Sequence, residues 1–191
     1  MEPVLAIVDG FAPDADALRE RALALPFRRP EGVNYPGVEA AAAFAAEGVI
    51  ERVAQLLGGT PLRWRGQPGA VRLTTAADAA ERTSLVHADA PDFTAILHLS
   101  AAPAEGTYFY RHRALNIARI DPGAPWLPFV RQAAARDTLD LSAWEVTRLV
   151  PARFNRLVLF DGKFFHSGAQ SLTGADAAEG RLTCNYFFDR V

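Results

Sequence analysis

The feature that most constrains the fold is a series of short strand-like segments that begins near Gly69 and continues to the C-terminus. β-Branched and aromatic residues are frequent in these segments, and turn-forming residues separate them, as is typical of strands in a β-rich domain. The segments are 70–75, 84–87, 93–99, 106–111, 144–150, 156–160, 164–167 and 181–188. Eight strands are the number in a jelly roll, so the sequence predicts an α+β, mainly β fold with a cupin-like double-stranded β-helix.

The first third of the chain predicts a helical layer in front of these strands. A strand over residues 2–8 leads to a helix that opens near Ala12, where Asp side chains suit a helix N-terminus. The alanine-rich segment from Val38 to Leu57 is the longest helix candidate, and it ends at a pair of glycines. We expect its apolar stripe to pack under the sheet.

The strand pattern is interrupted by residues 112–143, which include a helix candidate from about Leu127 to Ala135. Long insertions in compact domains are usually either functional or disordered. We expect this one to cover the mouth of the barrel, with Trp126 as a substrate contact. An inert surface insertion is the alternative.

The chain length is near the usual size of a single domain. We therefore expect one domain over residues 1–191. Residues 1–68 would form the helical support layer, and residues 69–191 would form the double-stranded β-helix core with the insertion.

Two histidines and one aspartate are the candidate metal ligands. His87 and Asp89 are two residues apart, so in an extended segment their side chains point the same way. His166 is the best candidate for a third ligand from elsewhere in the fold. Two imidazoles and one carboxylate can hold a non-haem Fe(II) and leave positions open. An isolated His-x-Asp triplet also occurs by chance, without a metal.

The last strand-like segment carries a candidate anion clamp. Arg181 and Thr183 lie on one face of an alternating strand. A guanidinium can pair with both oxygens of a carboxylate, and a hydroxyl two residues away can assist. A surface ion pair is the alternative for Arg181. His98, on another strand, could hydrogen-bond a cofactor or substrate, or could be a core histidine.

In their order along the chain, these motifs resemble the 2-oxoglutarate/Fe(II)-dependent dioxygenase superfamily, nearest its prolyl-4-hydroxylase-like branch and small uncharacterised bacterial members of that kind. The resemblance runs from about Val71 to the C-terminus. Its signposts are His87-Ala-Asp89, Phe93–Ser100, Glu105–Tyr110, Pro151–Phe160, His166 and Arg181-x-Thr183. Arg181 lies further beyond His166 than the family's basic residue usually does, and the family's tyrosine before the His-x-Asp motif is missing.

The resemblance implies an oxygenase that uses Fe(II) as cofactor and 2-oxoglutarate as cosubstrate with O2. Such an enzyme hydroxylates a C–H bond and releases succinate and CO2. The two histidines and the aspartate would be the metal ligands and the catalytic centre. Arg181, helped by Thr183, would hold the far carboxylate of the oxo acid. Tyr108 would be a further cosubstrate contact, although a core role is also open to it.

Composition narrows the classes of partner. A formal net charge of −2 gives no reason to expect a nucleic acid or a membrane surface. No apolar run is long enough to cross a bilayer, and no secretory signal is evident. The single cysteine, Cys184, excludes an internal disulfide and agrees with a reducing, cytoplasmic compartment. We expect a small-molecule or peptidyl substrate.

Two other functions fit the same motifs. A cupin-like metal enzyme that uses no oxo acid, such as an isomerase, would keep the triad but have no use for Arg181. A non-catalytic binding module could use the same scaffold, because a fold alone does not fix a function. The intact triad favours an enzyme over a binding module.

Overall fold

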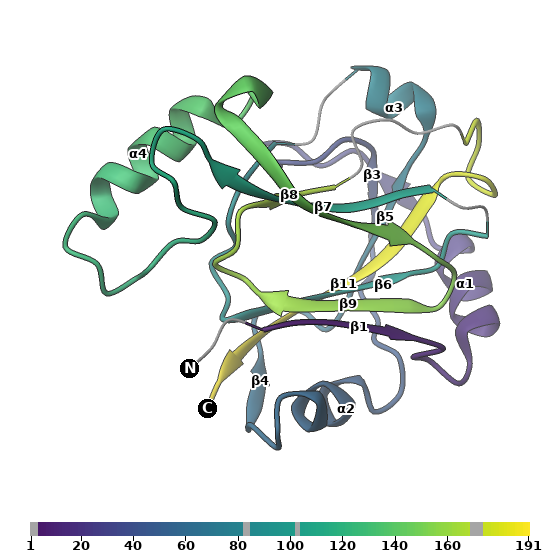
Figure 1. The fold of residues 1–191 in the computed structure, drawn as a ribbon. Coiled ribbons are helices and arrows are strands. Elements are labelled where there is room, and N and C mark those ends of the chain that lie inside the picture. The colour runs from purple at the N-terminus through teal and green to yellow at the C-terminus, as the bar shows by residue number, and fades with distance from the viewer. Residues whose placement is uncertain (1–3, 82–84, 102–103, 169–173) are drawn as a thin grey trace.

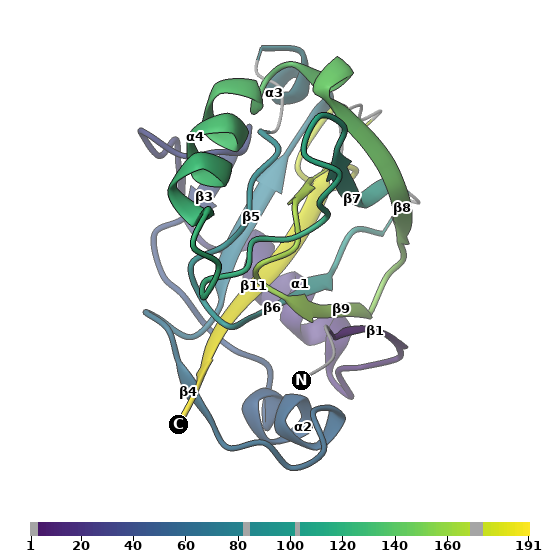
Figure 2. The same ribbon diagram turned by 60° about the vertical axis from the view of Figure 1, so that its left-hand side comes forward.

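The chain folds into two antiparallel β-sheets that face each other, with helices packed around them (Figures 1 and 2). The computed structural model describes residues 4–81, 85–101, 104–168 and 174–191. Within these ranges the larger sheet has eight strands. Its main path runs β1 (Leu5–Asp9), β9 (Arg156–Asp161), β6 (Phe93–His98), β11 (Arg181–Arg190), β5 (Ala70–Thr74), β3 (Val38–Ala40) and β2 (Phe27–Arg28), and β4 (Leu62–Trp64) pairs with β11.

The smaller sheet has three strands in the described ranges, in the order β10 (His166–Ser167), β7 (Ala104–His112) and β8 (Trp144–Ala152). The helices are α1 (Ala15–Leu23), α2 (Val49–Leu56), α3 (Ala76–Glu81) and α4 (Leu127–Asp137), and a short 3-10 helix spans Leu141–Ala143. The prediction of an α+β, mainly β fold is confirmed, and the two antiparallel sheets are consistent with a jelly roll. No helix in the described ranges is both long and apolar enough to span a bilayer.

The centre of the larger sheet is buried on both faces. Every residue of β6 and β9 is buried. Because side chains alternate along a strand, Leu157 and Leu159 of β9 join the core under α1 and α2, whereas Val158 and Phe160 face the smaller sheet. Cys184 also lies in the core under α1 and α2.

The space between the two sheets holds both apolar and polar side chains. Phe109 and Val150 from the smaller sheet pack against Phe160 and its neighbours. Further along the same face of the larger sheet, polar side chains replace the apolar ones. They include Thr94, His98, Thr183 and Asn185, all of which are buried. This polar part of the interior contains the candidate functional site.

The prediction of a single helix from Val38 to Leu57 is wrong in its first half. Residues 38–40 form β3, which pairs with β5, and the helix begins only at Val49, after Gly48 in the left-handed conformation. Phe44 is buried, and its backbone N–H donates to the Gly69 carbonyl. Pairing with the sheet therefore overrides the helix propensity of alanine in this segment.

The predicted strand at 84–87 is not found. Residue 84 lies outside the described residues, and only an isolated bridge joins His87 to His166. The other predicted strands after residue 69 are confirmed within a few residues. The short strands β2, β3 and β4 were not predicted from the sequence, and they extend the larger sheet.

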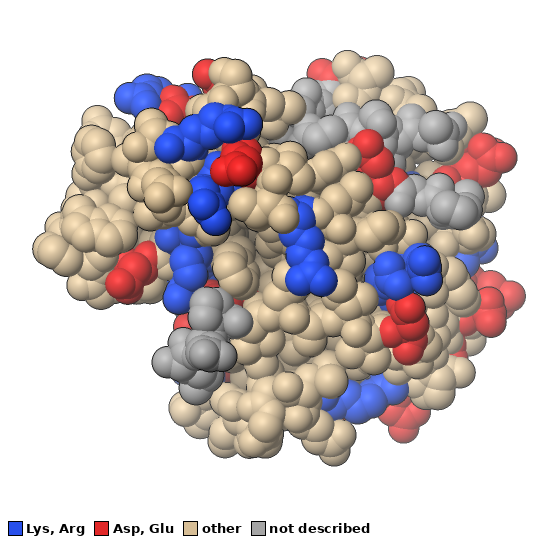
Figure 3. Space-filling view, in the orientation of Figure 1, with Lys and Arg blue, Asp and Glu red and all other residues tan. Residues whose placement is uncertain are grey.

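The insertion 112–143 contains α4, as predicted, and α4 projects from one side of the molecule (Figure 1). Val130 and Ala134 of α4 pack on Trp144 and Phe165. On the face in Figure 3, acidic and basic side chains are interspersed among a majority of other residues, so the described part of that face has no large patch of one sign.

Candidate metal centre

Main-chain hydrogen bonds bring the two candidate ligand segments together. The N–H of His87 donates to the carbonyl of His166 at 3.0 Å, and the N–H of His166 donates to the carbonyl of His87 at 2.8 Å. β10, which carries His166, pairs in turn with β7, where Phe109 lies opposite His166. The sheet therefore fixes the position of both histidines.

The three predicted ligands converge. His87, Asp89 and His166 each offer one ligand atom, and these atoms all lie within 4.8 Å of one another. His87 Nε2 lies 3.4 Å from one carboxylate oxygen of Asp89, and His166 Nε2 lies 3.4 Å from the other. The structure thus brings together residues that are far apart in the sequence.

The hydrogen bonds of the imidazoles determine what they present to this space. The Nδ1 atom of His87 lies 2.9 Å from the carbonyl oxygen of Leu85, and the Nδ1 atom of His166 lies 2.9 Å from that of Phe164. A carbonyl oxygen only accepts, so each neutral ring carries its proton on Nδ1 and directs the Nε2 lone pair at Asp89. Two lone pairs and a carboxylate facing one another form a site that a cation completes.

The charge states fit the same site. Burial, and then the neighbouring His166, lowers the pKa of His87. Burial alone would raise the pKa of Asp89, but the charge and the hydrogen bonds that His166 and His87 supply when protonated hold that pKa well below its usual range. A neutral imidazole and an ionised carboxylate are the forms that bind a divalent metal.

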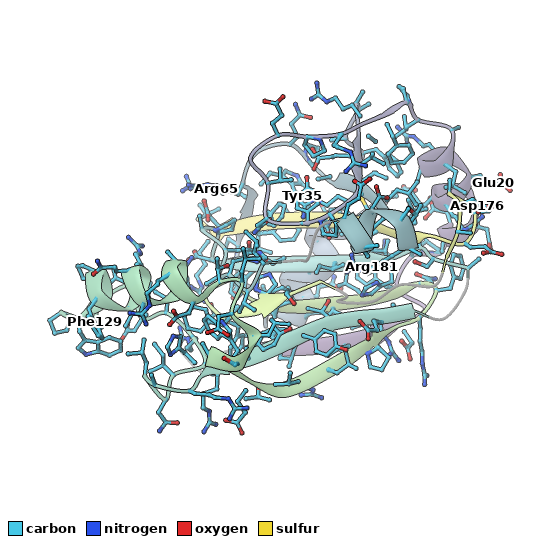
Figure 4. All side chains as sticks on the ribbon, turned by 90° about the horizontal axis from the view of Figure 1, so that it is seen from above. Glu20, Tyr35, Arg65, Phe129, Asp176 and Arg181 are labelled. Atoms are coloured by element: carbon cyan, nitrogen blue, oxygen red, sulfur yellow. The ribbon has the colours of Figure 1, made fainter. Side chains whose placement is uncertain are left out.

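The triad opens into a cavity between the sheets. The other lining residues come from the loop before β3 and from β5, β6, β11 and the end of β10. They are Asn34, Tyr35, Pro36, Arg72, Thr74, Thr94, Ile96, Gly168, Arg181, Asn185 and Phe187. Figure 4, viewed from above, shows Tyr35 and Arg181 near the middle of the molecule.

Arg181 lies in this cavity as an uncompensated cation. Within the described residues, no carboxylate lies within ion-pair distance of its guanidinium, and its buried Nε has no hydrogen-bond partner. Burial, and then the nearby Arg72, lowers the pKa of Arg181 to about 10, so it is charged at neutral pH. A buried charge without a partner is unfavourable, which is typical of a site that binds a counter-ion.

Other buried polar groups accompany Arg181. Both ring nitrogens of His98 lack hydrogen-bond partners in the described chain, as does the hydroxyl of Thr107. Burial, and then Arg181 and Arg156, holds the pKa of His98 well below its usual range, so the ring is neutral. Thr183, predicted to assist Arg181, is fully buried, and its hydroxyl accepts a hydrogen bond from the Asn185 side chain at 3.2 Å.

One wall of the cavity, which we call its roof, contains Tyr35 and Arg72, with Glu39 beside them. The Arg72 guanidinium lies 3.8 Å from the centroid of the Tyr35 ring, and its Nε lies 3.3 Å from a carboxylate oxygen of Glu39. The Tyr35 hydroxyl donates to the same oxygen at 2.6 Å. The loop is anchored because the Asn34 carbonyl accepts a hydrogen bond from the Leu85 N–H.

Tyr108 does not lie where the sequence predicted. Its neighbour Phe109 faces His166 and the inter-sheet core, so Tyr108 points to the opposite face of β7. There it packs with the cluster that contains Trp144, and it stacks on Tyr110 at 6.1 Å between ring centroids. It does not line the cavity.

The insertion 112–143 packs beside the two histidine segments, because the Val86 N–H donates to the Thr138 carbonyl and the Phe165 N–H donates to the Ala118 carbonyl. It contributes none of the described residues that line the cavity, whereas the loop at Tyr35 does line it, so a role of the insertion as a lid stays a prediction. Trp126 is 47% exposed and lines a separate apolar hollow on the surface with Phe129. Figure 4 shows Phe129 at the far end of α4, away from Arg181.

Several residues around the triad were missed in the sequence. Thr94 donates to a carboxylate oxygen of Asp89 at 2.6 Å, and its place near the start of a predicted strand gave no hint of this contact. The roof residues come from a loop whose sequence carries no signal of its position. Arg72 lies on the predicted strand 70–75, but its neighbours Tyr35 and Glu39 are distant in sequence.

Solved structures with this fold are known. AviO1 from Streptomyces viridochromogenes Tue57 is similar over 98% of this chain and 90% of its own, with a TM-score of 0.56 and 14% identity. HygX from Streptomyces hygroscopicus with iron bound gives a TM-score of 0.54 and 18% identity, over 98% of this chain and 82% of HygX. HygX with nickel, 2-oxoglutarate and hygromycin B bound gives a TM-score of 0.51 and 17% identity, over 98% of this chain and 83% of HygX. At these identities the likeness shows a shared fold.

None of the curated proteins matches the sequence at a significant level. A family model does match, and it covers residues 1–188, which is almost the whole chain. Its description is a family of unknown function. The chain therefore belongs to the DUF6445 family.

Proposed function

We propose that the protein is an Fe(II)- and 2-oxoglutarate-dependent oxygenase that hydroxylates a C–H bond and releases succinate and CO2. The observation that carries the proposal is that the His-Asp-His triad and the unpaired Arg181 line the same cavity. The triad suits a divalent metal, and the buried guanidinium suits a carboxylate. A cosubstrate that chelates a metal and carries a second carboxylate matches both.

In this proposal His87, Asp89 and His166 are the metal ligands. Their donor set is that of a non-haem Fe(II) site with open positions on one side. When bound, the iron would supply the activation of O2, coupled to the oxidative decarboxylation of the oxo acid. Thr94 would hold the Asp89 carboxylate in place through its hydrogen bond.

Arg181 would pair with the distal carboxylate of 2-oxoglutarate. Its guanidinium has no competing carboxylate in the described chain, so an incoming one would satisfy it. Asn185 lines the cavity, so its side-chain amide could donate to the oxo acid. HygX, which shares the fold, was crystallised with nickel and 2-oxoglutarate, and this supports the same pairing of metal and oxo acid.

The fold would serve this chemistry as a double-stranded β-helix, formed as one domain over residues 1–191. The two sheets would exclude bulk water from the metal. The Tyr35 loop would line the opening of the cavity through which the substrate enters. We propose a small-molecule or peptidyl substrate. HygX with hygromycin B bound shows that a protein of this fold accommodates a ligand besides the oxo acid.

A metal enzyme that uses no oxo acid is less consistent with these residues, because it would leave Arg181 as a buried charge without a partner. A binding module is less consistent as well, since it would have no need for two imidazoles whose Nε2 lone pairs face an ionised carboxylate.

Conversion of 2-oxoglutarate to succinate tests the proposal. Protein loaded with Fe(II) without oxygen would be exposed to air with 2-oxoglutarate, and succinate and CO2 would be measured. We expect slow turnover even without the primary substrate, its loss in His166→Ala, and strong reduction in Arg181→Leu. The matched control is Arg63→Leu, since Arg63 is exposed and outside the cavity. No succinate from iron-loaded wild type, with any candidate substrate, would argue against the proposal.

A further inference from the structure

Lys163 is the only lysine in the chain, although lysine and arginine together number 20. All the other residues in this count are therefore arginines. Lys163 lies in the turn between β9 and β10, three residues before His166. A sequence that uses arginine everywhere else and lysine here suggests that this position needs an ammonium group.

The contacts of Lys163 explain this need. Its Nζ donates to the carbonyl oxygens of Asp89 at 3.1 Å, Ala90 at 2.5 Å and Pro91 at 2.7 Å. An ammonium group has three donors and rotates freely, so it can meet three acceptors on one turn. A guanidinium is planar and wider, and its fork suits two parallel acceptors instead.

The backbone of the same turn also forms hydrogen bonds to residues 89–92. The N–H of Asp89 donates to the Gly162 carbonyl at 2.6 Å, and the Gly162 N–H donates to the Asp92 carbonyl at 2.9 Å. A Cβ atom at Gly162 would lie 2.4 Å from the Pro91 carbonyl oxygen, so only glycine allows this approach. Lys163 therefore closes a set of contacts that reaches the backbone of Asp89.

The turn leads directly to the second histidine. The carbonyl of Phe164, the residue after Lys163, accepts the hydrogen bond from Nδ1 of His166. One short segment thus holds the backbone that follows Asp89 and orients the ring of His166. The two ligands come from distant parts of the sequence, and this turn joins them.

We propose that Lys163 is a positioning residue that sets the place of Asp89 relative to His166 and thereby the metal affinity of the triad. The inference rests on the metal role assigned to the triad under the proposed function. Lys163 lies outside the ligand set, and a guanidinium cannot replace its ammonium group in this role. Groups that orient metal ligands typically contribute 10–100-fold to affinity.

Binding of Mn(II) tests the inference without any turnover. Free Mn(II) would be measured by electron paramagnetic resonance in titrations of wild type, Lys163→Met and Lys163→Arg. We expect both variants to bind Mn(II) roughly 10–100-fold more weakly than wild type, with a changed spectrum of the bound ion. The thermal midpoint of each metal-free variant would confirm that it is folded.

Arg119→Met is the matched control. Arg119 forms an ion pair with Asp161 in the same turn, at 3.1 Å, but makes no described hydrogen bond to the 89–91 carbonyls. Its loss should leave Mn(II) affinity within about twofold of wild type if the role belongs to Lys163. Wild-type affinity in folded Lys163→Met would overturn the proposal, and full rescue by Lys163→Arg would overturn the need for an ammonium.

The outcome separates this inference from the oxygenase proposal. If wild type binds Mn(II) but not 2-oxoglutarate, the proposed function fails and the role of Lys163 is still tested. If Lys163→Met binds like wild type while succinate is formed, only the inference fails.

A second measurement keeps the inference testable if the variants do not fold. In wild type labelled with 15N-lysine, the side chain of Lys163 gives the only lysine ammonium resonance. Three hydrogen bonds should slow its proton exchange enough for the signal to be observed. An ammonium that exchanges as fast as that of free lysine would contradict the contacts on which the proposal depends.

Discussion

At the scale of residues, the site is defined by groups that lack a partner inside the protein. The Nε2 lone pairs of His87 and His166 face a carboxylate, and Arg181 is a buried cation without a carboxylate in the described chain. Each arrangement is unfavourable by itself and becomes favourable when a ligand of opposite charge binds. The same groups that make the protein less stable therefore indicate what it binds.

Arg181→Leu should separate stability from binding. The substitution removes a desolvated, unpaired charge, so the metal-free protein should unfold at a higher temperature than wild type. 2-Oxoglutarate binding to the Fe(II) form should weaken by about 2–4 kcal/mol, and Fe(II) affinity should change little. Calorimetric unfolding and anaerobic binding titrations would measure both. A lower unfolding temperature with unchanged oxo-acid affinity would show that Arg181 has a structural partner instead.

The sequence could predict that His87, Asp89 and His166 converge near Arg181, because their residue types and their order are distinctive. The position of Tyr108 could not be predicted, because which face of a strand a residue occupies depends on register, and β7 has register shifts against β8 on both sides of the 107–109 segment. Tyr35 and Arg72 meet only in the folded chain. Contacts of this kind leave no local pattern in the sequence.

At the scale of elements, a glycine in β7 positions the smaller sheet. A Cβ atom at Gly106 would lie 1.8 Å from the Val150 carbonyl oxygen and 2.7 Å from the Ala152 nitrogen. A methyl group there would force β7 away from β8. Phe109, three residues later, packs near His166, with 6.4 Å between the ring centroids.

Gly106→Ala should therefore destabilise the fold by about 1–3 kcal/mol or more, the usual effect of overpacking, and weaken metal binding as well. Urea unfolding would measure the first effect. Gly123→Ala is the control, because its nearest neighbour would be 3.6 Å away and surface changes of this kind are within about 0.5 kcal/mol. Equal stability of the two variants would contradict the close approach of β7 and β8.

The end of α4 is tied to β7 and β8 by Asp137. Its carboxylate accepts from Arg136 and from Nε2 of His112, and its backbone carbonyl accepts from the Trp144 indole. His112 Nδ1 accepts from the Leu115 N–H, so Nε2 carries the proton. The hydrogen bonds from Arg136 lower the pKa of Asp137 to about 2, against the effect of burial and with help from His112.

This lowered pKa predicts a pH-dependent contribution to stability. On acidification the unfolded chain binds the Asp137 proton first, so the stabilisation is present above about pH 4 and is lost as the pH falls toward about 2. The difference in unfolding free energy between wild type and Asp137→Asn should be larger at pH 5 than at pH 2, and it should shrink as the pH falls below about 4. Urea titrations at each pH would measure it. A difference that stays constant or widens in acid would contradict the ion pair.

The elements themselves were partly predictable. Strands with strong β character, such as β6 and β11, and the helix α4 follow from local patterns. The segment 38–48 did not, because alanine favours a helix locally while pairing with β5 and burial of Phe44 decide its structure. Edge strands of two or three residues have too few residues for a periodic signal.

At the scale of the whole molecule, the fold places an apolar core and a polar cavity on opposite faces of one sheet. α1 and α2 cover the first face, and the smaller sheet covers the second (Figure 2). The candidate metal triad lies where the His87–His166 bridge joins the loop before β6 to β10 of the smaller sheet. The order of the motifs is read directly from the sequence. The position of the Tyr35 loop at the cavity could not be predicted, because the loop comes from the N-terminal third, far in sequence from the motifs.

The most direct test of the account is an anaerobic titration of the protein with Fe(II) and then 2-oxoglutarate, followed by visible absorption. We expect a weak charge-transfer band that requires both additions and saturates at one equivalent of iron. The band should be absent in His166→Ala and should need far more 2-oxoglutarate in Arg181→Leu. A wild-type protein that binds iron at the triad but gives no band at any concentration of 2-oxoglutarate would contradict it.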